Sequence, residues 1–499
     1  MKNLQCILQL MLAFIIQTTT FGQVSHSISF SQNNAQFSSI TGEDGVDYQR
    51  ISFSETHSTQ ELGNPELPEK YIKLIVPSNE DVESVTIKNL TQVSVVGNYL
   101  IYPVQHPVPL DEGELPPFVE PNPDIYNSDN LYPSNCTAYI RDGYFDGANH
   151  IIIIAVYPYQ YKPKSSKLFF NSLIEFTVNF KTGISRIIQV HTRSEKNQVM
   201  YDQILLNSVD NPEMISEFQV KPTNIRSNPI ETLGFYEYVI ITSNALKNTF
   251  NNFIEWKKRK GINIGVVTTE EIYANYTGDL TSGIYDDAGK VRQYLSDAYQ
   301  EGTVWVLLAG DHIVVPVRYG RGGNNSDITD NIIPADIYYS DFNGDWEIDG
   351  DGRYGEPQDN VDDNPEIFVG RVPCSSIQDI NYWVEKLITY EQNPGNGDLS
   401  YLTNTFWIKG HNIWVDPSTI IPHCPPTLTH TNWNDYNNYT GAQVVAKMSD
   451  HFGLLNWHAH GDVFVFTLNS TQNVLTKDDY QWDTGPNNGL DNMTNNKYY

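Results

Sequence analysis

Residues 238–242 read Tyr-Val-Ile-Ile-Thr, a continuous apolar run that is typical of a strand buried on both faces of a sheet. Apolar residues then recur at helical spacing from Leu246 to Ile254, and Gly261 ends the pattern. Further strands and helices are expected in alternation, at Ile264–Thr268, Gly289–Tyr299, Val304–Ala309 and Ile380–Tyr390. This alternation predicts an α/β domain with a mostly parallel sheet covered on both faces by helices.

The residues upstream follow a different pattern, in which short alternating apolar runs are separated by turns containing Pro, Asn and Gly. The runs are Tyr71–Val76, Val82–Ile87, Val93–Val96, Ile151–Val156 and Ile174–Phe180. They predict an all-β, sandwich-like domain over residues 24–182. Residues 183–232 are polar and weakly periodic, which indicates an extended linker, so we assign the α/β domain to residues 233–499.

The N-terminus has the pattern of an export signal. Lys2 precedes the apolar run Leu4–Ile16, which is too short to span a bilayer, and a small or polar stretch follows. We expect a signal peptide over residues 1–23, and a secreted or cell-surface protein. The alternative interpretation is a buried N-terminal helix.

The charge balance excludes one class of partner. The chain has 31 Lys and Arg against 60 Asp and Glu, a net charge of −29, and this negative field repels nucleic acid and anionic membranes. After signal cleavage three cysteines are expected, Cys136, Cys374 and Cys424, which are too few for a disulfide framework.

An acidic loop begins at Asp341 and contains six carboxylates within the sixteen residues that end at Glu356. Oxygen-bearing side chains at every second position, with glycines between them, are the arrangement that a hard cation needs. The loop opens like an EF-hand but lacks the glycine at the sixth position. We therefore predict bound calcium rather than a solvated acidic turn, and the candidate ligands are Asp341, Asn343, Asp345, Asp349 and Asp351.

Polar residues also follow two predicted strands, where catalytic groups of parallel sheets usually lie. After Ala309, the sequence Gly310–Asp311–His312 has either a structural role in the turn or a catalytic one. After Trp457, the sequence is His458, Ala459, His460, Gly461 and Asp462. This second group suits a general base, although His-x-His-x-Asp is also an arrangement found in zinc hydrolases.

Several ordered motifs together resemble the gingipain family of cysteine endopeptidases. In the α/β part they are Ala-Gly-Asp-His (309–312), Glu-Ile-Phe-Val-Gly-Arg-Val-Pro-Cys (366–374), Lys-Leu-Ile-Thr-Tyr-Glu (386–391) and Asn-Trp-His-Ala-His-Gly (456–461). In the β-rich part, Gly-Asn-Pro-Glu-Leu-Pro (63–68) and Val-Tyr-Pro-Tyr-Gln-Tyr-Lys-Pro (156–163) resemble the propeptide of that family. The resemblance implies a caspase-like catalytic domain preceded by a propeptide that acts as an intramolecular inhibitor.

The resemblance also implies roles for particular residues. His460 matches the catalytic histidine, Glu366 the acid that orients it, and Asp379 the carboxylate that recognises a basic side chain. Gly461 lies where the substrate backbone and the oxyanion would bind. The family's nucleophilic cysteine follows the histidine, but residues 461–499 contain no cysteine, and neither Cys374 nor Cys424 is a credible substitute. We therefore expect a chain truncated before its nucleophile and inactive as it stands.

Three readings of the function follow from these expectations. The first is a secreted cysteine endopeptidase precursor that acts on protein substrates after its propeptide is cut away. The second is a non-catalytic, calcium-stabilised surface protein that binds peptides, and the third reading is a zinc hydrolase that uses His458, His460 and Asp462. For the precursor, the basic residues at which activation cleavage is expected are Arg186, Arg193, Lys196, Lys221 and Arg226.

Overall fold

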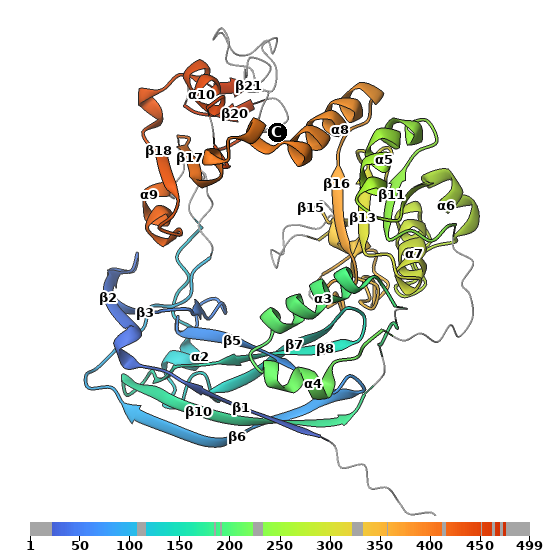
Figure 1. The fold of residues 1–499 in the computed structure, drawn as a ribbon. Helices are drawn as coiled ribbons and strands as arrows, with labels where there is room; N and C mark the ends of the chain where they lie inside the picture. The colour runs from blue at the N-terminus through green and yellow to red at the C-terminus, as the bar shows by residue number, and fades with distance from the viewer. Residues whose placement is uncertain are drawn as a thin grey trace, which may run out of the picture. The chain divides into compact units, whose positions relative to one another are not determined.

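The structure is a computed structural model that describes residues 22–106, 116–183, 186–189, 192–222, 233–321, 333–356, 358–411, 416–450, 452–461, 465–469 and 473–475. The chain forms two compact units (Figure 1). The first unit contains residues 1–104, 119–244 and 262–373, and the second contains residues 105–118, 245–261 and 374–499. Residues 1–21 lie outside the described residues, so the signal peptide stays a prediction.

The N-terminal part of the first unit contains two antiparallel sheets, with strand orders β1-β10-β6, to which β9 adds by pairing with β10, and β4-β5-β8-β7. The strands are β1 (Gln23–Ser29), β4 (His57–Ser58), β5 (Pro68–Ile75), β6 (Glu80–Ser94), β7 (Thr137–Phe145), β8 (Asn149–Val156), β9 (Tyr159–Lys162) and β10 (Lys167–Thr182). The inward-facing side chains of Ile72, Ile154 and Phe176 bring the two sheets into one core. A separate antiparallel pair joins β2 (Ala35–Thr41) to β3 (Asp47–Phe53).

Two expectations for this part are wrong in detail. The runs Val82–Ile87 and Val93–Val96 were predicted as separate strands, but all of the first and the first half of the second lie in the single long strand β6. The predicted extended linker contains the helix α3 (Glu195–Ser208), which starts at the N-cap Ser194 and buries Tyr201 and Leu205. Because those two side chains recur at a spacing of four, they pack together against an apolar cluster of β5, β7 and β8.

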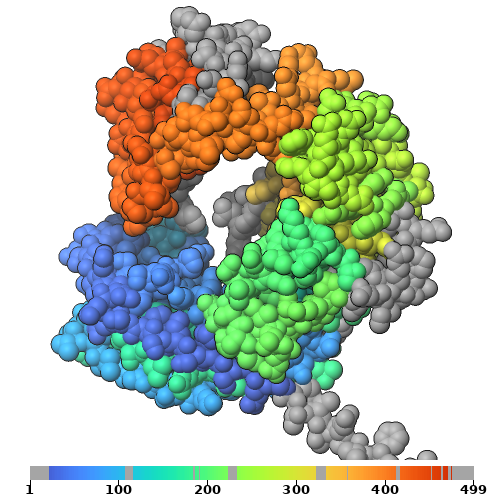
Figure 2. Space-filling view, viewed as in Figure 1, coloured from blue at the N-terminus to red at the C-terminus, as the bar shows by residue number. Residues whose placement is uncertain are grey.

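The helix α3 is followed by the short helix α4 (Ile215–Phe218), and both lie on the surface beside the N-terminal strands (Figure 2). A short helix α2 (Pro123–Tyr126) lies between β6 and β7 in sequence.

The rest of the first unit is an α/β structure. Its parallel sheet has the order β12-β11-β13-β16, formed by β11 (Tyr238–Thr242), β12 (Ile264–Thr268), β13 (Trp305–Ala309) and β16 (Phe368–Val372). The helices α6 (Thr269–Asn275) and α7 (Asp287–Gln300) begin at Thr268 and Asp286, whose side chains accept hydrogen bonds from backbone N–H groups of the first turn. Between β13 and β16 the chain makes a long excursion that contains β14 (Tyr319–Gly320), β15 (Ile333–Pro334) and the acidic loop.

The second unit contains a second parallel sheet, in the order β18-β17-β19. Its elements are α5 (Asn251–Arg259), α8 (Ile377–Gln392), β17 (Asn404–Lys409), α9 (Pro417–Ile420), β18 (Thr429–Trp433), α10 (Gly441–Met448), β19 (Leu454–His458), β20 (Val465–Thr467) and β21 (Asn473–Leu475). Phe406 and Ile408 of β17 pack against Val444 and Val445 of α10. The prediction of parallel strands alternating with helices is confirmed, but the described strands form two parallel sheets instead of one.

A search of the described helices for a segment that is both long and apolar enough to cross a membrane found none.

Candidate active site

The two histidines singled out in the sequence lie at the carboxyl end of β19 in the second unit. His458 is the last residue of the strand, in register with Lys409 of β17, and its carbonyl oxygen accepts a hydrogen bond from the Gly410 N–H at 2.7 Å. His460 lies two residues beyond the end of the strand. The rule that side chains two positions apart in a strand point to the same side therefore does not apply to His458 and His460. Both histidines are half-buried.

The backbone that follows His460 turns back at once. The His460 carbonyl oxygen accepts a hydrogen bond from the Thr467 N–H at 2.8 Å, and Gly461 forms an antiparallel bridge with Phe466. The ring of Phe466 stacks on Trp457 with centroids 5.3 Å apart. Gly461 itself is exposed, and the side on which a Cβ atom would lie faces the Val465 carbonyl oxygen at 3.0 Å.

Gly410 is a residue of this site that sequence reasoning missed. A Cβ atom at position 410 would lie 2.7 Å from the Thr467 carbonyl oxygen and 2.8 Å from the Cβ of Ala459. The bend that carries His458 and His460 therefore fits against β17 only because residue 410 has no side chain. The signal was present in the sequence, since the apolar run Phe406–Ile408 is followed closely by Gly410 and His411, much as Gly461 follows the histidines after β19.

Asp379 has a structural role in the described contacts. It lies in the first turn of α8, where its N–H donates to Ser376 Oγ at 3.1 Å and its carboxylate accepts from Ser376 Oγ at 2.5 Å. This reciprocal pair caps the helix and places an acidic group at the helix N-terminus. Its proposed role as the group that recognises a basic substrate side chain stays a prediction, and helix capping accounts for its position without that role.

Glu366 lies in the first unit, just before the amino end of β16, and is fully buried. Its Oε2 accepts a hydrogen bond from the Phe342 N–H at 2.6 Å, whereas its Oε1 is buried without a partner among the described residues. Burial, reinforced by the nearby carboxylates of Asp341 and Asp362, raises the pKa of Glu366 well above its ordinary range. Its role in orienting His460 stays a prediction, while its hydrogen bond already anchors the start of the acidic loop.

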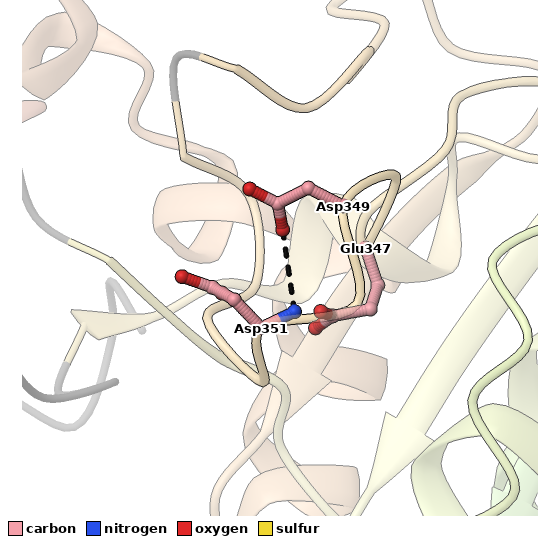
Figure 3. Close-up of side chains that lie close together, drawn as sticks. All are labelled: Glu347, Asp349 and Asp351. Carbon is pink, nitrogen blue, oxygen red and sulfur yellow. Dashed lines mark hydrogen bonds between the residues drawn. The ribbon is translucent and has the colours of Figure 1, made fainter.

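The acidic loop brings together only part of the predicted calcium ligand set. Carboxylate oxygens of Glu347, Asp349 and Asp351 lie within 4.8 Å of one another, and Figure 3 shows the three side chains gathered around one turn. The Asp351 N–H donates to Asp349 Oδ1 at 3.3 Å, which closes that turn. Glu347 was not among the predicted ligands, although it belongs to the same alternating pattern.

Asp341 was predicted as a ligand, and that assignment stays a prediction, although its contacts are those of a core residue. Its carboxylate is fully buried and accepts hydrogen bonds from the Gly344 N–H at 2.7 Å, the Asp362 N–H at 3.0 Å and the Trp346 indole at 2.9 Å. The guanidinium of Arg292 lies 3.8 Å away. Since protein donors occupy both oxygens, Asp341 is a core residue of the loop.

The other two predicted ligands also lie outside the cluster of three carboxylates. Asn343 is buried, and Asp345 accepts a hydrogen bond from the Glu347 N–H at 3.0 Å while its backbone pairs with Asn360.

The structural reading of Asp311 agrees with the contacts. Its carboxylate accepts hydrogen bonds from the N–H groups of Ile313 and Val314, at 2.9 and 3.2 Å. Asp311 therefore shapes the turn after β13.

None of the three cysteines among the described residues is an obvious candidate for an activated thiol. Cys136 is buried in the core of the N-terminal sheets, and Cys374 and Cys424 are half-buried. Burial, with Asp379 nearby, raises the pKa of Cys374, which favours the unreactive thiol form. Asp462, the third residue of the zinc reading, lies outside the described residues.

Comparison with known proteins identifies the family. The sequence model of Peptidase family C25 matches residues 232–494, more than half of the chain, and that of Propeptide_C25 matches residues 17–214. The chain therefore belongs to peptidase family C25 and carries the propeptide of that family, so it is a cysteine peptidase precursor by descent.

Among characterised proteins, Gingipain R2 of Porphyromonas gingivalis is 23% identical over 382 residues, which cover 74% of this chain and 44% of the relative. Gingipain R1 of the same species is 25% identical over 171 residues, 34% of this chain and 14% of the relative. The chain thus spans less than half the length of the relatives that it matches.

Two solved structures are similar in part. The complex of RgpB pro- and mature domains from Porphyromonas gingivalis shares 19% identity, with a TM-score of 0.32, over 38% of this chain and 93% of that one. The latent form of gingipain K shares 24% identity, with a TM-score of 0.28, over 33% of this chain and 90% of that one.

Proposed function

We propose that the chain is the propeptide and part of the caspase-like catalytic domain of a secreted cysteine endopeptidase, with His460 as the general base. The observation that carries this proposal is the position of His460. It follows a strand of a parallel sheet, in a chain of peptidase family C25, and an exposed glycine follows it directly. The carboxyl end of a parallel strand is where such sheets place reacting groups.

In the proposed reaction, the imidazole of His460 takes the proton of a cysteine thiol, and the thiolate attacks the carbonyl carbon of the peptide bond. Backbone N–H groups beside Gly461 hold the oxygen of the tetrahedral intermediate. The imidazolium then returns the proton to the leaving amine, and water hydrolyses the thioester that remains. Because Cys136, Cys374 and Cys424 do not fit the role of nucleophile, we propose that this 499-residue chain by itself does not cleave peptides.

We further propose that the propeptide inhibits the catalytic domain until it is removed. Two contacts within the first unit support this, because they join the propeptide to the peptidase segment. Tyr201 Oη donates to the Glu366 carbonyl oxygen at 2.7 Å, and Tyr299 Oη donates to Asp146 Oδ1 at 2.9 Å. Arg193 pairs with the same Asp146 at 2.5 Å, and both side chains are buried.

These contacts correct one expectation about cleavage. Arg193 was predicted as an activation point, but its side chain is only 1% exposed and is held by the ion pair with Asp146. Lys196 and Lys221 are exposed, and Arg226 lies outside the described residues. We propose that the first activating cut falls after α4, between Lys221 and the start of the peptidase match at residue 232.

The proposed function is tested with the complete reading frame. The encoded protein is assayed for hydrolysis of peptides with basic and neutral residues before the scissile bond, with and without a thiol-alkylating reagent. We expect activity that alkylation abolishes and a labelled cysteine that is none of the four in this sequence. Hydrolysis that resists alkylation but is lost on removal of zinc would favour the metal-dependent reading, and peptide binding without any hydrolysis would favour the non-catalytic one.

We also propose calcium as a structural ion of the acidic loop, at Glu347, Asp349 and Asp351. Their carboxylate oxygens are close enough to share one ion, and three like charges within 4.8 Å repel one another when no cation is bound. A ligand that binds only the native state stabilises it by about 2.7 kcal/mol at 100 times its dissociation constant.

The calcium proposal is tested by thermal unfolding in chelator and in millimolar calcium. We expect a higher Tm with calcium for the wild type, a lost increase in Asp349→Asn, and a retained increase in Asp345→Asn, which lies outside the cluster. Equal melting curves of the wild type in both conditions would refute the proposal.

A further inference from the structure

Residues 465–469, which we call the clamp, lie beside the bend that carries His460. The Thr467 N–H donates to the His460 carbonyl oxygen at 2.8 Å, whereas the Leu468 carbonyl oxygen accepts a hydrogen bond from the His411 N–H at 2.9 Å. His411 lies two residues beyond the end of β17, just as His460 lies two residues beyond the end of β19. The clamp therefore connects the backbone that follows two neighbouring strands.

The place of these two strands within the sheet makes the connection relevant to function. β17 lies between β18 and β19, so the strand order reverses at β17. In open α/β sheets, ligands bind outside the carboxyl ends of the strands at such a reversal. The Gly410 N–H donates to the His458 carbonyl oxygen at 2.7 Å, so β17 and β19 stay paired up to this edge. The clamp thus contacts the backbone where the sheet is expected to bind a substrate.

The C-terminal half of the clamp is anchored in the core of the second unit. The Leu468 side chain is fully buried, in the apolar cluster that contains Ile408 of β17 and Val444 of α10. Asn469 is buried as well, and its Nδ2 donates to the Tyr436 carbonyl oxygen at 3.1 Å. Because a close-packed core leaves little room for displacement, these contacts fix the end of the clamp.

The N-terminal half of the clamp is the strand β20, which has two further contacts. It forms an antiparallel pair with β21, whose Val474 is fully buried in the same apolar cluster. Phe466 points out of that cluster, is 40% exposed, and stacks on Trp457 of β19. Main-chain hydrogen bonds and one ring contact therefore transmit the position of the core to the bend after β19.

The His460 imidazole depends on this backbone for its position. Among the contacts between described residues, no hydrogen bond and no ring contact holds the imidazole itself. The place of the ring is therefore set by the main chain of the bend, to which the clamp is bonded. A displacement of about 1 Å at a reacting group can cost about 10²-fold in rate.

We propose that Leu468 is a positioning residue for His460. By anchoring the clamp in the core, Leu468 holds the bend after β19 and, through the main chain, the imidazole. The expected effect of Leu468 on peptide hydrolysis rests on the proposed function, whereas its effect on the His460 bend does not.

The first test uses the 499-residue chain and needs no activity. We expect the amide hydrogens of Thr467 and His411 to exchange at least about tenfold more slowly than in an unfolded chain, because both N–H groups are bonded. In Leu468→Ala both amides should exchange faster than in the wild type, and NMR relaxation should show a more mobile His460 ring.

Two further variants separate anchoring from general core stability. Val444→Ala empties part of the same core from α10, and it should leave the two amides and the His460 ring as in the wild type. Asn469→Ala removes the donor to Tyr436 without emptying the core, and it should give the changes of Leu468→Ala to a smaller extent. Asn469→Ala takes the place of Leu468→Ala if the latter does not fold.

The second test measures peptide hydrolysis by the complete reading frame. Leu468→Ala should lower kcat by about 10–10²-fold and change KM by less than about threefold, because the base is displaced while substrate binding is kept. Leu468→Met, which nearly conserves the volume, should restore most of kcat. Val444→Ala should keep kcat, whereas a merely structural effect would lower it in both alanine variants alike.

Several results would overturn the proposal. They are fast exchange of the Thr467 and His411 amides in the folded wild type, a His460 ring that is unchanged in the folded anchoring variants, and equal losses of kcat in Leu468→Ala and Val444→Ala. If the exchange and ring measurements give the expected results but the complete protein hydrolyses no peptide, the positioning of His460 by Leu468 stands and the proposed function fails.

Discussion

Both parallel sheets of this chain place their first strand between the next two, but they differ at their carboxyl ends. In the first unit, the end of β16 hydrogen-bonds to the segment that follows β13. Arg371 of β16 donates to both carboxylate oxygens of Asp336 and to the carbonyl oxygens of Gly310, Val315 and Pro316. Thr242 at the end of β11 donates to the Ala309 carbonyl oxygen at 2.6 Å.

In the second unit, the carboxyl ends of the strands are followed by glycines and by half-buried histidines. His458 and His460 follow β19, and Gly410 allows the close approach of the chain that positions them. Polar groups with satisfied hydrogen bonds stabilise a fold, whereas polar groups left accessible beside an open backbone can act on a substrate. The contacts of the first sheet support the structure, and this difference favours the proposal that the second sheet carries the chemistry.

The largest effect is expected for the histidine beyond β19. In the complete reading frame, His460→Ala should lower kcat/KM for peptide hydrolysis by about 10²–10⁴-fold, because the general base is lost. His458→Ala should retain activity within a few-fold, since His458 is still a residue of the strand itself. A His460→Ala enzyme with near-normal turnover would remove the second sheet from the proposed chemistry.

Arg371→Ala tests the opposite role in the first sheet. The substitution leaves three carbonyl oxygens and the Asp336 carboxylate without this donor, and we expect a loss of about 2–3 kcal/mol in the free energy of unfolding. Denaturant unfolding measures the change. Lys290→Ala, which removes an exposed pair with Asp287 on α7, is the control and should cost less than about 0.5 kcal/mol. Equal losses in both variants would contradict the structural role of Arg371.

Gly410→Ala sharpens the comparison within the second sheet. The added methyl group meets the Thr467 carbonyl oxygen and Ala459, so we expect about 1–3 kcal/mol of destabilisation in thermal or denaturant unfolding. Gly370 of β16 has open space where a Cβ would lie, so Gly370→Ala in the first sheet should be nearly neutral. If Gly410→Ala were as well tolerated as Gly370→Ala, the packing argument for the histidine bend would be wrong.

The smallest effect is expected at Asp379. Asp379→Ala removes the capping contact with Ser376 and should destabilise α8 by about 0.5–1 kcal/mol. We expect no change in the preference of the active enzyme for basic over neutral peptides. A selective loss of cleavage after basic residues would restore Asp379 as the recognition group and would refute its purely structural role.

Much of the architecture could be predicted because it depends on local patterns. The strands at Tyr238–Thr242 and Ile264–Thr268 have the predicted bounds, since an unbroken apolar run between turn residues has few alternatives to a buried strand. The helix α3 was missed because its apolar residues are few and widely spaced in a polar stretch, and packing against β5, β7 and β8 stabilises it.

The ordered motifs were enough to indicate the family, and the family match confirms it.

The tertiary structure decided which polar residues are already occupied. Asp341 and Glu347 look alike in the sequence, but Asp341 lies in the core, where the Trp346 indole and two backbone N–H groups donate to it, and Glu347 joins the carboxylate cluster. Similarly, Arg186 and Arg193 were both predicted as cleavage points. In the structure Arg193 is buried against Asp146, whereas Arg186 pairs with Asp142, which also contacts His150. Sequence alone determined which chemical groups are present and which strands they follow. Their partners come from segments far apart along the chain, so only the folded packing determined which groups are neutralised in the core and which remain able to react.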